Sequence, residues 1–102
     1  MLKDAICKRL DFIIQEIQAW PSKFQESVEI DNITNIELES LYHSARRIVV
    51  KLQGQCIGMI TLACDVLDVS IDYEWFYSKL NKTILDSYEK IGEIYNRELC
   101  NF

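Results

Sequence analysis

Hydrophobic residues recur every three or four positions over three long stretches of the chain, which is the spacing of one face of an α-helix. The stretches extend from Ile6 to Phe24, from Leu38 to Val66 and from Tyr73 to Leu99. Polar segments at residues 29–34 and 68–72 separate them. Because short connections make successive helices antiparallel neighbours, the pattern predicts an all-α, antiparallel up-down-up three-helix bundle.

Three local signals refine this prediction. Pro21 falls inside the first apolar seam and, because proline removes a backbone hydrogen bond, it predicts a kink or a short break after residue 20. Thr34 and Glu37 have the spacing of a capping box, which predicts the start of the second helix. Gly54 and Gly58 weaken that helix, and a break there would make a four-helix bundle. The seam keeps its phase across both glycines, which favours one continuous helix.

The middle helix has more apolar surface than a single seam uses. A second stripe runs beside the seam and consists of Val50, Ile57, Ile60, Cys64 and Leu67. A helix that is apolar nearly all round is surrounded by protein. The stripe is therefore either buried inside the bundle or covered by a second copy or another protein, and we favour an interface. Asp65 and Asp68 lie beside it, as charged groups often do at the rim of an interface.

Aromatic residues open the third helix, at the end of the bundle where the stripe also ends. Tyrosine and tryptophan are enriched at binding hot spots. Tyr73 and Trp75 are therefore candidates for exposed anchors, with a plug of packed rings as the alternative. The predicted partner-binding residues are Val50, Ile57, Ile60, Cys64, Asp65, Leu67, Asp68, Tyr73 and Trp75.

The composition narrows the class of protein. Among 102 residues there are three glycines and one proline, too few for the turns of an all-β fold, and the length fits a single helical domain spanning residues 1–102. Sixteen acidic and eleven basic residues give a net charge of −5, which argues against nucleic-acid binding. The longest uncharged stretch, residues 52–64, is too short for a membrane span, and the N-terminus lacks a signal-peptide pattern. We expect a soluble, cytoplasmic protein.

Few residues suggest chemistry. The four cysteines, Cys7, Cys56, Cys64 and Cys100, match no zinc or thioredoxin motif, and we interpret them as free thiols. The chain has a single histidine and shows no nucleotide-binding loop, metalloprotease pair or di-iron pattern. The sequence therefore predicts neither an enzyme nor a cofactor or metal site.

One short motif has a family resemblance. His43-Ser44-Ala45-Arg46 resembles the His-x-Leu-Lys core of histidine phosphotransfer domains, which are acidic helical bundles of about this length. The resemblance implies that His43 is the phosphoacceptor and that Arg46 steadies the phosphate. That family usually has glycine or another small residue at the next position, where this chain has Arg47. The resemblance covers four residues and the general size of the chain.

These observations favour a small acidic helical module that acts by binding another protein. An inhibitor or immunity-type protein that covers a basic surface fits the negative charge, because complementary charge speeds association. An adaptor is equally consistent, and the apolar stripe also predicts a homodimer. The alternatives are a phosphotransfer module that uses His43 and a purely structural homo-oligomeric subunit.

Overall fold

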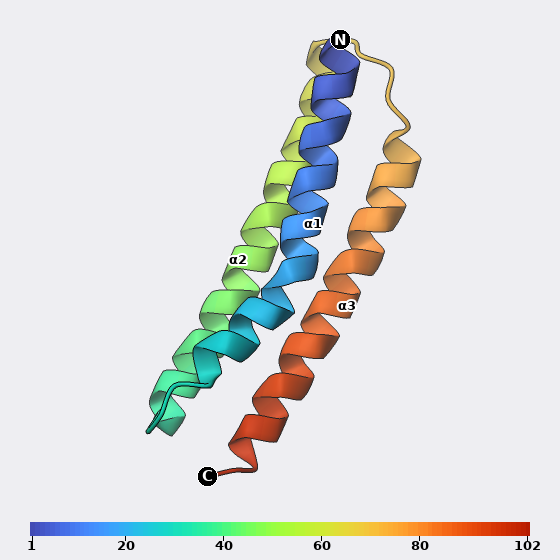
Figure 1. Ribbon diagram of the computed structural model, residues 1–102. Helices are drawn as coiled ribbons and strands as arrows, with labels where there is room; N and C mark the ends of the chain where they lie inside the picture. The colour runs from blue at the N-terminus through green and yellow to red at the C-terminus, as the bar shows by residue number, and fades with distance from the viewer.

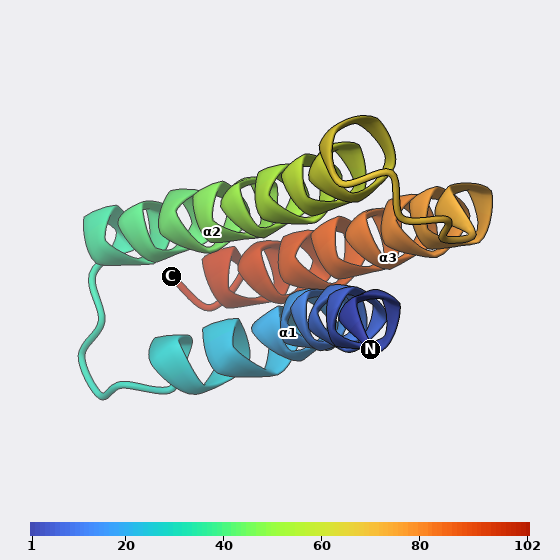
Figure 2. The ribbon, with the colours of Figure 1, turned by 90° about the horizontal axis from the view of Figure 1, so that it is seen from above.

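The computed structural model describes residues 1–102 and contains three long helices. They are α1 (Leu2–Val28), α2 (Asn35–Thr61) and α3 (Tyr73–Leu99), and a short π-helical turn, η1 (Leu62–Val66), continues α2. α1 and α3 run in the same direction, α2 runs against them, and each helix packs on the other two (Figure 1 and Figure 2). The predicted antiparallel three-helix bundle is confirmed, and α2 is continuous through both of its glycines.

Side-chain caps begin α2 and α3. The Glu37 amide donates to Thr34 Oγ1 at 3.1 Å, and the Thr34 amide donates to Glu37 Oε1 at 3.4 Å, which is the predicted capping box. At the start of α3 the Trp75 amide donates to Asp72 Oδ1 at 3.1 Å. Each cap satisfies an amide that has no partner within its own helix, so both helices begin at defined residues.

α1 continues through Pro21, and Figure 1 shows it bending where its colour passes from blue to cyan. Proline has no amide hydrogen, so Pro21 cannot donate to the Ile17 carbonyl one turn earlier. Ser87 of α3 takes that place, because its Oγ donates to the Ile17 carbonyl at 2.9 Å in a buried hydrogen bond. The predicted kink is therefore present without a break in the helix, and α3 satisfies the carbonyl that α1 leaves free.

The hydrophobic core lies between the three helices along their whole length. Its residues from the helices and η1 are Ile6, Leu10, Ile13, Ile14, Ile17, Phe24, Val28, Leu38, Ala45, Val49, Leu52, Cys56, Ile60, Ala63, Phe76, Leu80, Ile84 and Ile91. Trp20, Tyr77, Tyr88 and Tyr95 are half-buried and pack against it. Most of each predicted seam therefore faces inward.

Three helices side by side make a thin rod. Its extents are 53 × 17 × 17 Å and its radius of gyration is 16.3 Å, whereas a compact chain of this length has a radius of gyration of about 13 Å. Asn35–Val66 is apolar and long enough, by length and composition alone, to cross a membrane, with a mean hydropathy of 1.2 in its most apolar window. Its buried residues share one core with α1 and α3, which is compatible with a soluble protein.

Candidate protein-interaction site

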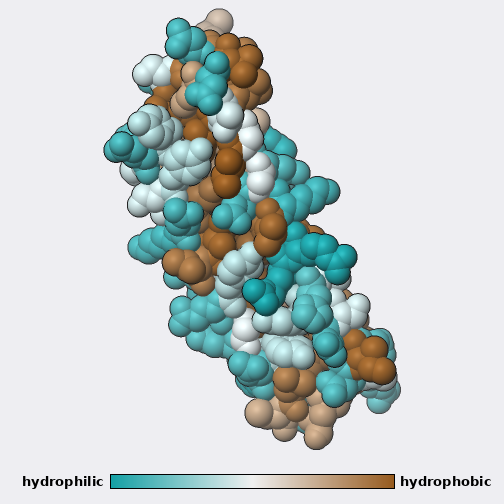
Figure 3. Space-filling view, turned by 180° about the vertical axis from the view of Figure 1, so that it is seen from behind, coloured by the Kyte–Doolittle hydropathy of each residue, from teal (hydrophilic) through white to brown (hydrophobic).

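Large apolar side chains gather at the end of the rod where the N-terminus, η1 and the start of α3 lie (Figure 1). Of the fourteen exposed large hydrophobic residues, seven belong to this apolar end: Met1, Leu2, Leu62, Val66, Leu67, Tyr73 and Trp75. Figure 3 shows hydrophobic surface at the same end, uppermost in the view. Such a concentration on a small protein is typical of an interaction site.

The π-helical turn explains why part of this surface faces outward. The Leu67 amide donates to the Leu62 carbonyl, five residues back, at 2.9 Å, and the Val69 amide donates to the Ala63 carbonyl at 2.8 Å. The first bond spans the five residues of a π-helix and the second spans six. Both are longer than the four-residue bonds of an α-helix, so they widen the turn and shift the phase of the residues that follow. Val66, which the seam placed inward, is consequently 70% exposed. The sequence prediction was wrong at this position because it assumed one α-helical period throughout.

One shallow hollow unites several of the predicted partner-binding residues. It has a volume of about 360 Å³ and is lined by Ile60, Thr61, Cys64, Asp65, Tyr73 and Tyr77. The rings of Tyr73 and Tyr77 meet edge to face, with their centroids 6.5 Å apart. This contact holds the half-exposed Tyr73 on the flank of α3 that faces α2.

Trp75 lies on the other flank of α3. Its ring packs edge to face on Phe76 at a centroid distance of 4.9 Å, and Lys79 Nζ lies over it at 4.8 Å from the centroid. Lys79 also lies 3.9 Å from Asp11 Oδ1 of α1, which places this flank beside α1. The indole is therefore held by its neighbours while about half of it, 48%, remains exposed.

The predicted stripe on α2 divides into parts with different environments. Ile60 is only 2% exposed and belongs to the core, so the prediction that it contacts a partner is wrong. The prediction failed because α1 and α3 together cover more of α2 than its apolar seam. A residue beside the seam, such as Ile60, therefore faces α3. Val50 and Ile57 are exposed, and they lie on the outer side of α2, away from the apolar end. Leu67 and Asp68 are exposed at the apolar end itself.

Acidic side chains surround the apolar end. Asp65, Asp68, Asp72 and Glu74 are all exposed, and none of them forms an ion pair within the chain. Asp68 also has a positive φ of 52°, a backbone conformation in which aspartate is tolerated better than most residues. The amino group of Met1 and Lys3 lie at the same end, so the charge around the apolar groups is negative in balance.

His43 and Arg46 lie together on α2, on the flank beside Tyr88 of α3. The His43 side chain is 56% exposed, and its Nε2 is 3.6 Å from Glu39 Oε1. The Arg46 guanidinium lies over the rings of Tyr42 and Tyr88, at 5.5 and 5.1 Å from their centroids. A shallow hollow is lined by His43, Arg46, Arg47, Val50 and Tyr88.

The cysteines and acidic residues form no chemical centre. All four cysteines are free thiols. Burial raises the pKa of the Cys56 thiol to about 11, which keeps it protonated at neutral pH. No group of three His, Cys, Asp or Glu side chains is placed to hold a metal ion.

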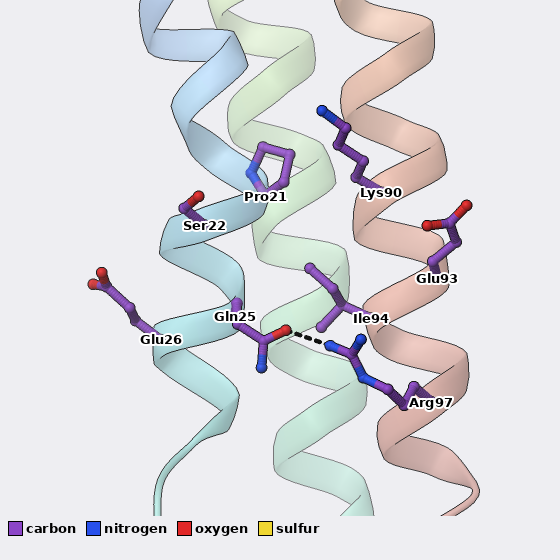
Figure 4. A pocket seen from close by; sticks show the side chains of 8 residues that line it. All are labelled: Pro21, Ser22, Gln25, Glu26, Lys90, Glu93, Ile94 and Arg97. Atoms are coloured by element: carbon purple, nitrogen blue, oxygen red, sulfur yellow. Dashed lines mark hydrogen bonds between the residues drawn. The ribbon is translucent and has the colours of Figure 1, made fainter.

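A third hollow, which the sequence did not suggest, lies between α1 and α3 near Pro21 (Figure 4). It is lined by Pro21, Ser22, Gln25, Glu26, Lys90, Glu93, Ile94 and Arg97. Arg97 donates across it to the side-chain oxygen of Gln25. Its charged residues carry both signs, so it has no strong preference for a cation or an anion.

Comparison with known proteins adds nothing to these surfaces, because no protein family, curated protein or solved structure matches the chain.

Proposed function

We propose that the chain is a protein-binding module that docks a partner on its apolar end. The observation that supports this most strongly is the gathering there of seven of the fourteen exposed large hydrophobic residues. Tyr73 and Trp75 are half-exposed aromatic residues already held in place by neighbouring rings. Aromatic side chains that lose little freedom on binding make good anchors.

The negative charge indicates which kind of partner fits. Asp65, Asp68, Asp72 and Glu74 have no ion-pair partner in the chain, and the net charge is −5. A partner with an apolar patch surrounded by basic residues complements this end, as expected of an inhibitor, an immunity-type protein or an adaptor. Its association rate falls as salt concentration rises, because salt screens the charges that steer the encounter.

The test begins with a photo-crosslinking amino acid in place of Trp75 and, as the matched control, in place of Leu85. Leu85 is also on α3 and is 69% exposed, but it lies outside the apolar end. We expect a specific crosslinked protein at position 75 and none at position 85, with identification by mass spectrometry. With that partner purified, Trp75→Ala is expected to weaken binding at least tenfold, and Leu85→Ala to leave it unchanged. Equal crosslinking at both positions, or equal affinity of both variants, contradicts the proposal.

Phosphotransfer is a second candidate, favoured by one observation: exposed His43 lies beside Arg46 and Arg47 in a common hollow. Guanidinium groups stabilise phosphate by paired hydrogen bonds. If the site is functional, phosphoramidate labels His43 at least tenfold faster in the folded chain than in urea, and Arg46→Ala slows the labelling. His43→Gln is the blank, because the chain has no other histidine. Equal labelling rates in the folded and unfolded chain contradict this candidate.

A further inference from the structure

The outer side of α2 is a second exposed surface, distinct from the apolar end in most of its residues. Arg47, Gly54, Gly58, Thr61 and Asp65 follow one another at steps of 7, 4, 3 and 4 residues, and all five are exposed. These steps place the first four along one side of α2. Asp65 follows in η1, where it also lines the hollow beside Tyr73 of α3. Val50, Ile57 and Leu62 flank this line and are 52%, 38% and 46% exposed. We call these eight residues the outer face of α2.

Figure 2 shows α2 on the side of the bundle opposite α1, so the back view in Figure 3 has α2 nearest the viewer. Hydrophobic surface runs down the upper half of this side in Figure 3, with hydrophilic groups on both flanks, and hydrophilic groups interrupt it below the middle. Within the chain nothing packs on Gly54 or Gly58, because a Cβ added at either would meet no atom within 4 Å.

Six of the eight residues of the outer face are arranged symmetrically about the level of residue 56, whereas Ile57 and Thr61 have Gln55 and Lys51 as their counterparts. Arg47 and Asp65 lie nine residues before and after it. Val50 and Leu62 lie six residues away on either side, and Gly54 and Gly58 lie two. A two-fold rotation about an axis through this level therefore exchanges positive with negative, apolar with apolar, and glycine with glycine.

We infer that a second copy of the chain packs antiparallel on the outer face of α2, with Arg47 of each copy paired with Asp65 of the other. This inference rests on the proposed function, since it names one protein partner. The outer face shares Thr61, Leu62 and Asp65 with the apolar end, but it does not include Tyr73 or Trp75. The main support for this antiparallel pairing is the charge of Arg47 and Asp65. Neither Arg47 nor Asp65 has an ion-pair partner within the chain, and a parallel arrangement would place like charges opposite each other.

The geometry of helix packing is compatible with this pairing. Arg47 lies in α2 and Asp65 in η1, 18 residues later, so at the α-helical rise of 1.5 Å per residue they are about 27 Å apart along the axis. Two helices that cross at about 20° stay within side-chain reach over that length. The absence of side chains at Gly54 and Gly58 lets the two backbones approach closely at the crossing point. A closed two-fold dimer of this kind buries the same face of both copies.

Substitutions that exchange the charges of Arg47 and Asp65 test the inference in the full chain. Sedimentation velocity at 1–100 µM protein measures whether each variant dimerises. Wild type is expected to be a dimer, and Arg47→Asp or Asp65→Arg to raise its dissociation constant at least tenfold, because each places two like-charged contacts in the interface. An equimolar mixture of the two single variants regains both attractive pairs and is expected to dimerise. The variant that carries both substitutions is expected to dimerise by itself.

Circular dichroism and thermal unfolding show that the variants are folded, which is expected because both positions are exposed and make no ion pair in the chain. A monomeric wild type overturns the inference, whatever else binds this face. A dimer that neither substitution weakens, or a mixture that fails to regain dimerisation, overturns the antiparallel pairing as well. Trp75→Ala should leave the dimer unchanged. The effect of this variant on partner binding therefore tests docking at the apolar end separately from dimerisation.

Discussion

At the scale of single residues, the hydrogen bond between Ser87 and Ile17 is the feature that the sequence suggested least. Pro21 predicted a kink in α1, and the kink is present. The carbonyl of Ile17 that the proline leaves unpaired accepts a hydrogen bond from Ser87, 70 positions later in the chain. Ser87 stands three residues after Ile84 and four before Ile91, which is the spacing of the inward face of α3. Its 2% exposure fits that spacing, but the partner of its hydroxyl is determined by how α3 packs on α1.

Ser87→Ala is expected to lower the free energy of unfolding by about 1–3 kcal/mol, because it leaves the buried Ile17 carbonyl without a donor. In the background of Pro21→Ala, the new amide at position 21 can donate to that carbonyl, so the same substitution should cost less than about 1 kcal/mol. Urea unfolding of the wild type, the two single variants and the double variant measures the coupling between Ser87 and Pro21. Ser78→Ala, at an exposed position on α3, controls for helix propensity. An equal cost of Ser87→Ala in both backgrounds would show that Ser87 does not compensate for the proline.

At the scale of secondary-structure elements, periodicity and capping were sufficient to predict all three helices and the continuity of α2. The capping box at Thr34 was predictable because its two hydrogen bonds are local. The π-helical turn was not, because the sequence does not show which carbonyl the Leu67 amide selects. The hydrogen bond to the Leu62 carbonyl turns Val66 outward, so that Val66 becomes part of the apolar end. This is the part of the candidate site that the periodicity did not predict. Ile60 was misplaced for a related reason, since its burial depends on where α3 lies.

At the scale of the whole molecule, the thin rod leaves little core for its length. Only 22 of 102 residues are buried, and stability depends on the area that folding removes from water. An interface along α2 would cover apolar surface that the single chain leaves exposed. The midpoint of thermal unfolding would then depend on protein concentration, because the dimer is favoured by mass action.

We expect that midpoint to rise by about 3–4 °C for each tenfold increase in wild-type concentration. Arg47→Asp should remove most of this dependence, because the variant unfolds from the monomer. Differential scanning calorimetry over a hundredfold range of concentration measures both proteins. A midpoint independent of concentration in the wild type speaks against a dimer that is stable when folded.

The bond from Ser87 to Ile17 also bears on which alignment of the helices is selected. Isoleucine and leucine have similar volumes, so seams built largely from them discriminate between axial registers less sharply than a buried polar pair does. The bond is the one buried contact among the side-chain hydrogen bonds of the bundle. Sliding α3 along α1 would leave a hydroxyl and a carbonyl both unpaired in an apolar interior, which is costly. A single serine thus favours the observed register of α3 on α1, much as a buried asparagine favours one register in a coiled coil.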